Sequence, residues 1–262
     1  MTPLYIHNGK KIHATDFLKA LKHLGVAPGD TLFVHPDISV FGKLALQNKD
    51  TLLSGLVGVF QDSVGKTGTI AMPTFTYSFC NGVTYDKMNT RSTVGALTEF
   101  FRHQPGVERS VHPIFSVAAW GNDKARILKT RKDCFGRDTV FGTLHAMNAK
   151  IVLFGVSFQA CTFLHYVEQI HAVPYRSMKT FQGTIIDGKR TYEDAYTYFV
   201  RPLDGSVEND FNRIEPYLRR EDLLKETMVG NGTILLVSAR DLFDAGASLL
   251  DADPYYFLQQ TV

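Results

Sequence analysis

The chain has 262 residues, 44% of them hydrophobic, with 28 Lys and Arg against 26 Asp and Glu. This much apolar material forms a large core, so a disordered protein is excluded and a single domain over residues 1–262 is expected. The near balance of charge argues against a nucleic-acid partner, which requires clustered basic residues. No run approaches the roughly 18 apolar residues of a membrane span and no signal peptide is recognisable, which predicts a cytoplasmic protein without a membrane partner.

The three cysteines are Cys80, Cys134 and Cys161. They are widely separated and show no CxxC spacing, so the sequence indicates neither a disulfide framework nor a zinc site. We expect reduced thiols that pack in the interior, and no metal.

Taken in chain order, helical and strand patterns alternate and predict an α/β fold with a mixed central sheet flanked by helices. The predicted helices cover residues 15–24, 50–63, 93–103, 162–171, 208–218 and 239–250, and the predicted strands cover 31–35, 69–72, 150–156 and 233–237. Ser92 is the expected N-cap of the helix over 93–103. An Asp187-Gly188 turn between strands over 184–186 and 190–200 predicts a hairpin, and therefore a small antiparallel lobe around 177–205.

The predicted helix over 162–171 carries Thr162, His165 and Glu168 at intervals of three residues, so a hydroxyl, an imidazole and a carboxylate would share one face. An amine must lose its proton before it attacks a thioester, and a histidine has the pKa that a base for this step needs. A neighbouring carboxylate would stabilise the imidazolium, and a hydroxyl could donate to the oxyanion.

A His and a Glu three residues apart can also be a plain helix-stabilising pair. The position of this pair, directly after the buried strand over 150–156, favours a functional site because open α/β sheets bind ligands at strand ends.

Two other kinds of function remain open. His165, Glu168 and His171 could bind zinc in a metal-assisted amidohydrolase, although His171 lies well off the face of His165 and no HExxH motif is present. Alternatively, the protein could bind CoA or a nucleotide without catalysis. Neither a Rossmann fingerprint nor a P-loop occurs in the sequence.

The order of the motifs resembles the aminoglycoside 3-N-acetyltransferase family of the antibiotic N-acetyltransferase superfamily, which is distinct from GNAT acetyltransferases. The similar segments are 29–35, 91–121, 150–168, and 210–211 followed by 230–241, and together they span nearly the whole chain. The resemblance implies a non-GNAT fold and transfer of acetyl from acetyl-CoA to an amine by direct attack in a ternary complex.

The resemblance also implies roles for single residues. His165 would be the general base, Glu168 would orient it, Thr162 would lie near the acyl carbonyl, and Asp210 is a weaker candidate for contacting the amine or the histidine. His35, Asp37 and Ser39 would lie near the pantetheine of CoA. The start of the helix after Ser92 would hold a CoA phosphate through Arg91, Ser92, Thr93, Val94 and Gly95. Arg109 and His112, which belong to the longest similar segment, are interpreted as structural.

One departure from the family concerns the first loop, where His35-Pro36-Asp37 stands in place of His-Ser-Ser, so the contacts with CoA would differ.

Four aromatic residues, Phe75, Tyr77, Phe79 and Tyr85, lie close together after the predicted strand over 69–72. They predict either a cleft in which aromatic rings stack on the ligand or a loop in which they pack on one another. Phe75 and Tyr77 are the predicted substrate-binding residues. With the near-neutral charge, this pattern favours a nucleotide-linked amino sugar of surface-polysaccharide biosynthesis over an aminoglycoside antibiotic. The sequence leaves the oligomeric state open.

Overall fold

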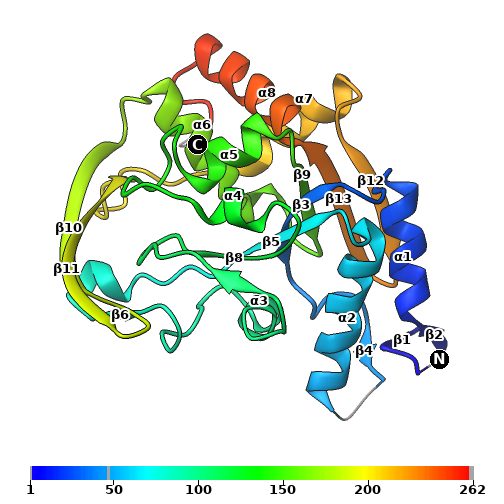
Figure 1. The fold of residues 1–262 in the computed structure, drawn as a ribbon. Coiled ribbons are helices and arrows are strands. Elements are labelled where there is room, and N and C mark those ends of the chain that lie inside the picture. The colour runs from blue at the N-terminus through cyan, green and yellow to red at the C-terminus, as the bar shows by residue number, and fades with distance from the viewer. Residues whose placement is uncertain (1, 46–47, 260–262) are drawn as a thin grey trace.

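The computed structural model describes residues 2–45 and 48–259 and is built around a seven-stranded mixed sheet with the order β12-β13-β9-β3-β5-β8-β7 (Figure 1). Its strands in chain order are β3 (Thr31–Pro36), β5 (Thr69–Pro73), β7 (Glu108–Arg109), β8 (Val117–Gly121), β9 (Lys150–Phe154), β12 (Lys225–Val229) and β13 (Gly232–Ser238). The central strands β9, β3 and β5 are parallel, and the outer strands pair antiparallel. The three parallel strands therefore end at the same edge of the sheet.

Helices cover both faces of this sheet, because its central strands are apolar on both sides. In β3, Leu32 and Val34 belong to one core and Phe33 to the other. The first core is closed by α1 (Ala14–His23), α2 (Lys49–Val64) and α3 (Ala96–Phe101). The second is closed by α4 (Lys124–Leu128), α5 (Val140–Ala146), α6 (Phe163–His171), α7 (Glu215–Arg220) and α8 (Ala239–Ala252). In Figure 1, α1 and α2 lie on the opposite side of the sheet from α5, α6 and α8. Within the described ranges, no helix is long and apolar enough to cross a membrane.

Two smaller sheets complete the fold. The hairpin of β10 (Ser177–Asp187) and β11 (Arg190–Val200) confirms the predicted antiparallel element, although its first strand is longer than expected, and the short strand β6 (Tyr85–Asp86) pairs with it in parallel. The hairpin forms a curved arm at the edge of the molecule (Figure 1). A second sheet joins β1 (Tyr5–His7), β2 (Lys10–Ile12) and β4 (Lys43–Leu44), none of which was predicted.

Two predicted helix starts are wrong. Helix α3 begins at Ala96 with Gly95 as its N-cap at φ 128°, because Glu99 of its first turn accepts a hydrogen bond from the Ser92 backbone N–H and holds residues 92–95 outside the helix. The helix expected over 208–218 is a 3₁₀ turn, η3 (Phe211–Ile214), followed by α7. Asp210 is the N-cap there, since its carboxylate accepts from the backbone N–H of Asn212.

The guanidinium of Arg109, on the edge strand β7, joins three segments of the chain. It is 5% exposed and donates to the Thr74 hydroxyl and carbonyl, to the Ser116 hydroxyl, and to the carbonyls of Lys87 and Thr90. This arrangement supports the structural interpretation of Arg109.

We expect Arg109→Lys to lower the free energy of unfolding by about 2–4 kcal/mol, because an ammonium group cannot reach all of these acceptors and leaves buried carbonyls unpaired. Urea unfolding measures the change. The exposed Arg220→Lys is the matched control, since Arg220 pairs with Glu221 and lies over the Tyr217 ring at the surface, and it should alter stability by less than about 0.5 kcal/mol. Equal effects of the two substitutions would contradict the assignment.

Candidate active site

A cavity of about 310 Å³ opens at the carboxyl ends of the parallel strands, where β3 ends at Pro36, β5 ends at Pro73, and the chain leaves β9 toward Val156. Its wall comprises His35, Pro36, Pro73, Phe75, Tyr77, Val94, Val156, Gln159, Ala160, Thr162 and His165, and we call it the His165 cavity. This is the position in open α/β sheets where ligands bind.

Helix α6 brings the predicted base and its carboxylate into contact. After β9 the chain makes a short 3₁₀ turn, η2 (Phe158–Ala160), and α6 then begins with Thr162 at its N-cap. Glu168 lies three positions after His165 on the helix, and this spacing places His165 Nδ1 2.6 Å from Glu168 Oε2. The side chain of His165 remains 21% exposed in the cavity wall, whereas that of Glu168 is fully buried.

Glu168 is held by partners from other parts of the chain. Its Oε1 accepts hydrogen bonds from the Tyr175 hydroxyl at 2.8 Å and from Asn209 Nδ2 at 2.8 Å. Arg176 Nε lies 2.9 Å from Oε2, in an ion pair whose N–H direction is not aligned for a hydrogen bond. Arg176 is anchored in turn by donation to Asn209 Oδ1 at 2.6 Å. This network fixes the rotamer of Glu168, and through it the ring of His165.

The electrostatic surroundings of His165 and Glu168 shift the pKa of both groups. Burial lowers the pKa of His165, and the charge of Arg176 lowers it further, although Glu168 opposes both effects. Burial alone would raise the pKa of Glu168, but its hydrogen bonds and the charges of His165 and Arg176 outweigh burial and hold it below the usual range. At neutral pH the pair is therefore a neutral imidazole and a carboxylate.

We expect the ring of His165 to titrate below the ordinary histidine value of about 6.5. Arg176→Gln should raise this pKa because it removes a nearby positive charge, whereas Arg176→Lys, which keeps the charge, should shift it less. NMR titration of ¹⁵N-labelled histidine, with His165→Ala to assign the signal, measures both values. A lower or unchanged pKa in Arg176→Gln would contradict this account of the charges.

The hydrogen bond to Glu168 decides what the ring can do. A carboxylate only accepts hydrogen bonds, so Nδ1 of the neutral ring carries the proton and Nε2 carries the free lone pair. Phe135 and Phe211 pack on the ring, with centroid distances of 5.3 and 4.9 Å. An oriented, neutral imidazole with a free Nε2 in a cavity wall can accept a proton from a bound ligand.

Not every residue predicted for catalysis joins this group. Thr162 lines the cavity beside His165. Asp210 does not hydrogen-bond His165 in the described part of the chain, since its carboxylate caps η3 instead. Its neighbour Asn209, which sequence reasoning missed together with Tyr175 and Arg176, contacts Glu168. No local pattern marks these three, because each comes from a loop whose place depends on tertiary packing.

The residues predicted for CoA are divided between the cavity and its surroundings. His35 and Val94 line the His165 cavity. The carboxylate of Asp37 accepts from the backbone N–H and the hydroxyl of Ser39, which itself lines a separate cavity of about 470 Å³.

The segment before α3 also differs from the prediction. Ser92 is 5% exposed, and its hydroxyl is engaged with Thr98, so the expected helix start at Ser92 is not present. Thr93 is held by the Phe75 carbonyl, Gly95 is the N-cap of α3, and Arg91 is exposed.

The four predicted aromatic residues are divided between the cavity wall and the core. Phe75 and Tyr77 line the His165 cavity, with Tyr77 45% exposed at its rim. Phe79 and Tyr85 are buried in the core, so they are not part of the predicted ring-stacking cleft. His112, interpreted as structural, is buried and accepts hydrogen bonds from the backbone N–H groups of Ile114 and Phe115.

The metal-ligand set of the alternative function is not assembled. His171 Nε2 lies 3.0 Å from Asp251, on the side of α6 that meets α8, while His165 Nδ1 is bound to Glu168. Across residues 2–45 and 48–259, no group of three or more His, Cys, Asp or Glu side chains is placed to hold a metal ion. The helix rotates His171 away from His165, as its six-residue separation requires.

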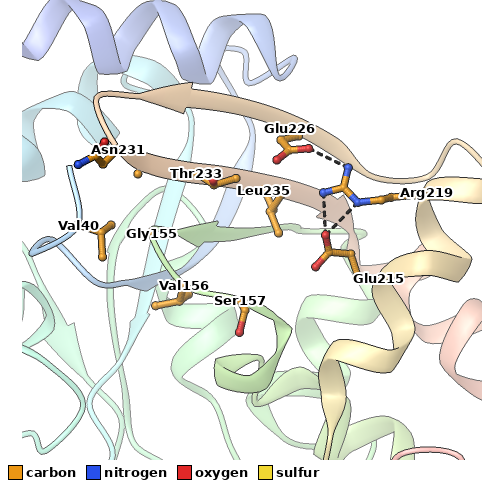
Figure 2. A pocket seen from close by; sticks show the side chains of 11 residues that line it. Val40, Gly155, Val156, Ser157, Glu215, Arg219, Glu226, Asn231, Thr233 and Leu235 are labelled. Carbon is orange, nitrogen blue, oxygen red and sulfur yellow. Dashed lines mark hydrogen bonds and ion pairs between the residues drawn. The ribbon is translucent and has the colours of Figure 1, made fainter. Parts of the chain in front are cut away.

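A second cavity, of about 340 Å³, adjoins the first because Val156 lines both (Figure 2). Arg219 in its wall donates to Glu215 at 2.7 Å and to Glu226 at 2.8 Å. On the far side, Val40 and Asn231 also line the cavity that contains Ser39. The three cavities therefore follow one another along the protein.

Comparison with known proteins decides the family. The model of the aminoglycoside 3-N-acetyltransferase family matches residues 33–251 of this chain. The chain belongs to the aminoglycoside 3-N-acetyltransferase family. It is 28% identical to aminoglycoside N(3)-acetyltransferase IV of Salmonella sp over 253 residues, which cover 93% of this chain and 89% of the relative.

Solved structures of aminoglycoside acetyltransferases share the fold. AAC(3)-IVa with a histidine-to-alanine substitution, in complex with a gentamicin, superposes with a TM-score of 0.77 at 25% identity, covering 95% of this chain and 92% of that one. AAC-IIIb in binary complex with CoASH gives a TM-score of 0.81 at 21% identity, covering 95% and 99%. The predictions of the family, the α/β fold and the N-acetyltransferase class are confirmed, and the predicted acetyl-CoA cosubstrate agrees with the CoASH held by AAC-IIIb.

Proposed function

We propose that this aminoglycoside 3-N-acetyltransferase family member transfers acetyl from acetyl-CoA directly to a primary amine of an amino sugar, with His165 as the general base. The observation that carries the proposal is the contact of 2.6 Å between His165 and the buried Glu168, which leaves His165 Nε2 free in the wall of a cavity at the strand ends. A sensor that only binds CoA would have no need of an oriented base supported by a buried ion pair.

The proposed reaction balances as follows. The lone pair of the neutral amine attacks the thioester carbon, and the π electrons of the carbonyl move to oxygen. His165 Nε2 accepts the proton that the amine loses, and Glu168 stabilises the resulting imidazolium. As the carbonyl re-forms, the C–S bond breaks and the thiolate of CoA leaves, taking a proton from the imidazolium. The products are an amide and free CoA, with His165 again neutral.

The side chains that line the His165 cavity favour one kind of amine substrate. Among the residues that line it, all within the described ranges, there is no Asp, Glu, Lys or Arg, and the only imidazoles are those of His35 and His165. Aminoglycosides carry several ammonium groups, whose binding normally calls for carboxylates, whereas an aromatic wall of Phe75 and Tyr77 suits the face of a sugar ring. These features favour a sugar that carries one amine, such as a nucleotide-linked amino sugar, over a polyamine antibiotic.

A substrate panel tests this preference. Thiol release from acetyl-CoA, with the acetylated product identified by mass, is compared for nucleotide-linked amino sugars and for gentamicin and apramycin. We expect a higher kcat/KM for a nucleotide-linked amino sugar, and Tyr77→Ala should raise KM for that acceptor more than it lowers kcat. Efficient acetylation of the antibiotics with no turnover of nucleotide-linked sugars would overturn the preference and leave the acetyltransferase class intact.

A further inference from the structure

His35 is a polar residue of the His165 cavity that takes no part in the proposed proton transfer. The imidazole of His35 forms part of the cavity wall at the end of β3, and its side chain is only 5% exposed. Its Nε2 is buried and forms no hydrogen bond with any residue of the described chain. A buried nitrogen without a hydrogen-bond partner lowers the stability of the fold by about 1–3 kcal/mol. Such groups are rare in folded proteins, and a hydrogen bond to a bound ligand would satisfy this one.

The charge state of His35 restricts what it can do. Burial lowers the pKa of this imidazole to about 3, so the ring is neutral throughout the physiological range. A group with so low a pKa is a poor base, but a neutral imidazole still carries one N–H that can donate a hydrogen bond. His35 is therefore suited to an oxygen acceptor rather than to a proton from the amine.

Apart from Thr162, the other polar side chains of the cavity are either hydrogen-bonded within the protein or lie at its rim. Gln159 is engaged at both ends, with the carbonyl of Asn209 and the backbone N–H of Phe211. Tyr77 lies at the exposed rim, and His165 is held by Glu168 as the base. Among the described side chains that line the cavity, His35 and Thr162 are therefore the donors left for that oxygen away from the exposed rim.

We propose that His35 donates a hydrogen bond to the thioester carbonyl oxygen of acetyl-CoA and, with Thr162, stabilises the oxyanion that forms during transfer. The inference rests on the proposed acetyl transfer and adds a second histidine to it. His35 removes no proton; with the proton of its neutral ring on Nε2, this N–H would donate to the oxygen that gains the electron pair when the amine attacks, and the bond would weaken again when the C–S bond breaks. A donor aimed at this oxygen contributes most in the transition state.

Infrared spectroscopy tests the contact without any acceptor. Acetyl-CoA labelled with ¹³C at the carbonyl is bound to the protein, and its C=O stretch should move to lower wavenumber because a donor polarises the bond. The shift should persist in His165→Ala, which removes the base alone, shrink in His35→Phe, and survive in part in His35→Gln, whose amide keeps a donor. An unchanged shift in His35→Phe would overturn the proposal.

Kinetics give a second readout. We expect His35→Phe to lower kcat by about 10²–10³-fold, with a much smaller change in KM for acetyl-CoA, and His35→Gln to retain part of the activity. Calorimetry of CoA binding shows whether each variant is folded. If His35→Phe does not fold, the activity of His35→Gln still tests the proposal. A kcat of His35→Phe within a few-fold of wild type would contradict the role.

The two proposals can fail separately. Turnover of no amine by the wild type, with the carbonyl shift present and sensitive to His35, would overturn the proposed function alone. Failure of the wild type to bind acetyl-CoA would overturn both.

Discussion

Replacing His165 with Ala is expected to lower kcat for acetyl transfer by about 10²–10⁴-fold, the usual contribution of a general base. The loss follows from geometry, because no other residue of the His165 cavity combines a free basic nitrogen with a supporting carboxylate. His35 is excluded as a substitute by its pKa of about 3. Thiol release at saturating acetyl-CoA measures the effect.

His171→Ala is the matched control. His171 lies on the same helix and also contacts a carboxylate, that of Asp251 at the surface, but it does not line the cavity. Its substitution should leave kcat within about twofold. CoA affinity, measured by calorimetry, should be retained in both variants. Activity of His165→Ala within fivefold of wild type would remove the base from the mechanism.

Glu168→Ala is expected to destabilise the fold by about 3–5 kcal/mol, because it leaves the buried guanidinium of Arg176 without its carboxylate. The Tyr175 hydroxyl and the Asn209 amide lose their common acceptor at the same time. Urea unfolding measures the change. Glu168→Gln, which preserves the shape, should lower kcat by about 10²–10⁴-fold, because the imidazolium loses its counter-charge and the ring its orientation.

A control substitution and a double-mutant cycle test the role of the hydrogen-bonded network around Glu168. Glu215→Ala removes a carboxylate from the partly exposed ion pair with Arg219 and should cost about 0–1 kcal/mol. In a double-mutant cycle, the combination of Glu168→Gln with Arg176→Gln should be less destabilising than the sum of the single changes, since the two charges meet in one buried pair. An additive cycle, or a loss for Glu168→Ala as small as for Glu215→Ala, would contradict the role given to the network.

The sequence predicts the long elements of the fold because their signals are local. The amphipathic pattern of α1 and the apolar runs of β3 and β9 need no knowledge of their neighbours. The strands β6 and β7 contain only two residues each and exist because of partners elsewhere; β6 pairs with Ile185 and Ile186 of the distant hairpin. Such elements have no periodicity to detect.

The candidate site likewise combines residues that local spacing predicts with residues that only tertiary packing brings together. Spacing within one helix correctly predicted the contact of His165 with Glu168. It could not predict Tyr175, Arg176 or Asn209, which reach Glu168 from loops after α6 and before η3. Asp210 illustrates the limit: it was predicted near the histidine, but its neighbour Asn209 contacts Glu168, because neighbouring residues in a loop point in different directions.

The central claim is direct acetyl transfer to an amine, and one measurement tests it most directly. Wild-type protein is mixed with acetyl-CoA and the acceptor panel, and thiol release, the mass of the amine product and the intact mass of the protein are recorded together. We predict one thiol released for each amine acetylated, and no acetyl group on the protein when the acceptor is omitted. Accumulation of acetylated protein, or thiol release without an acetylated amine, would contradict the account.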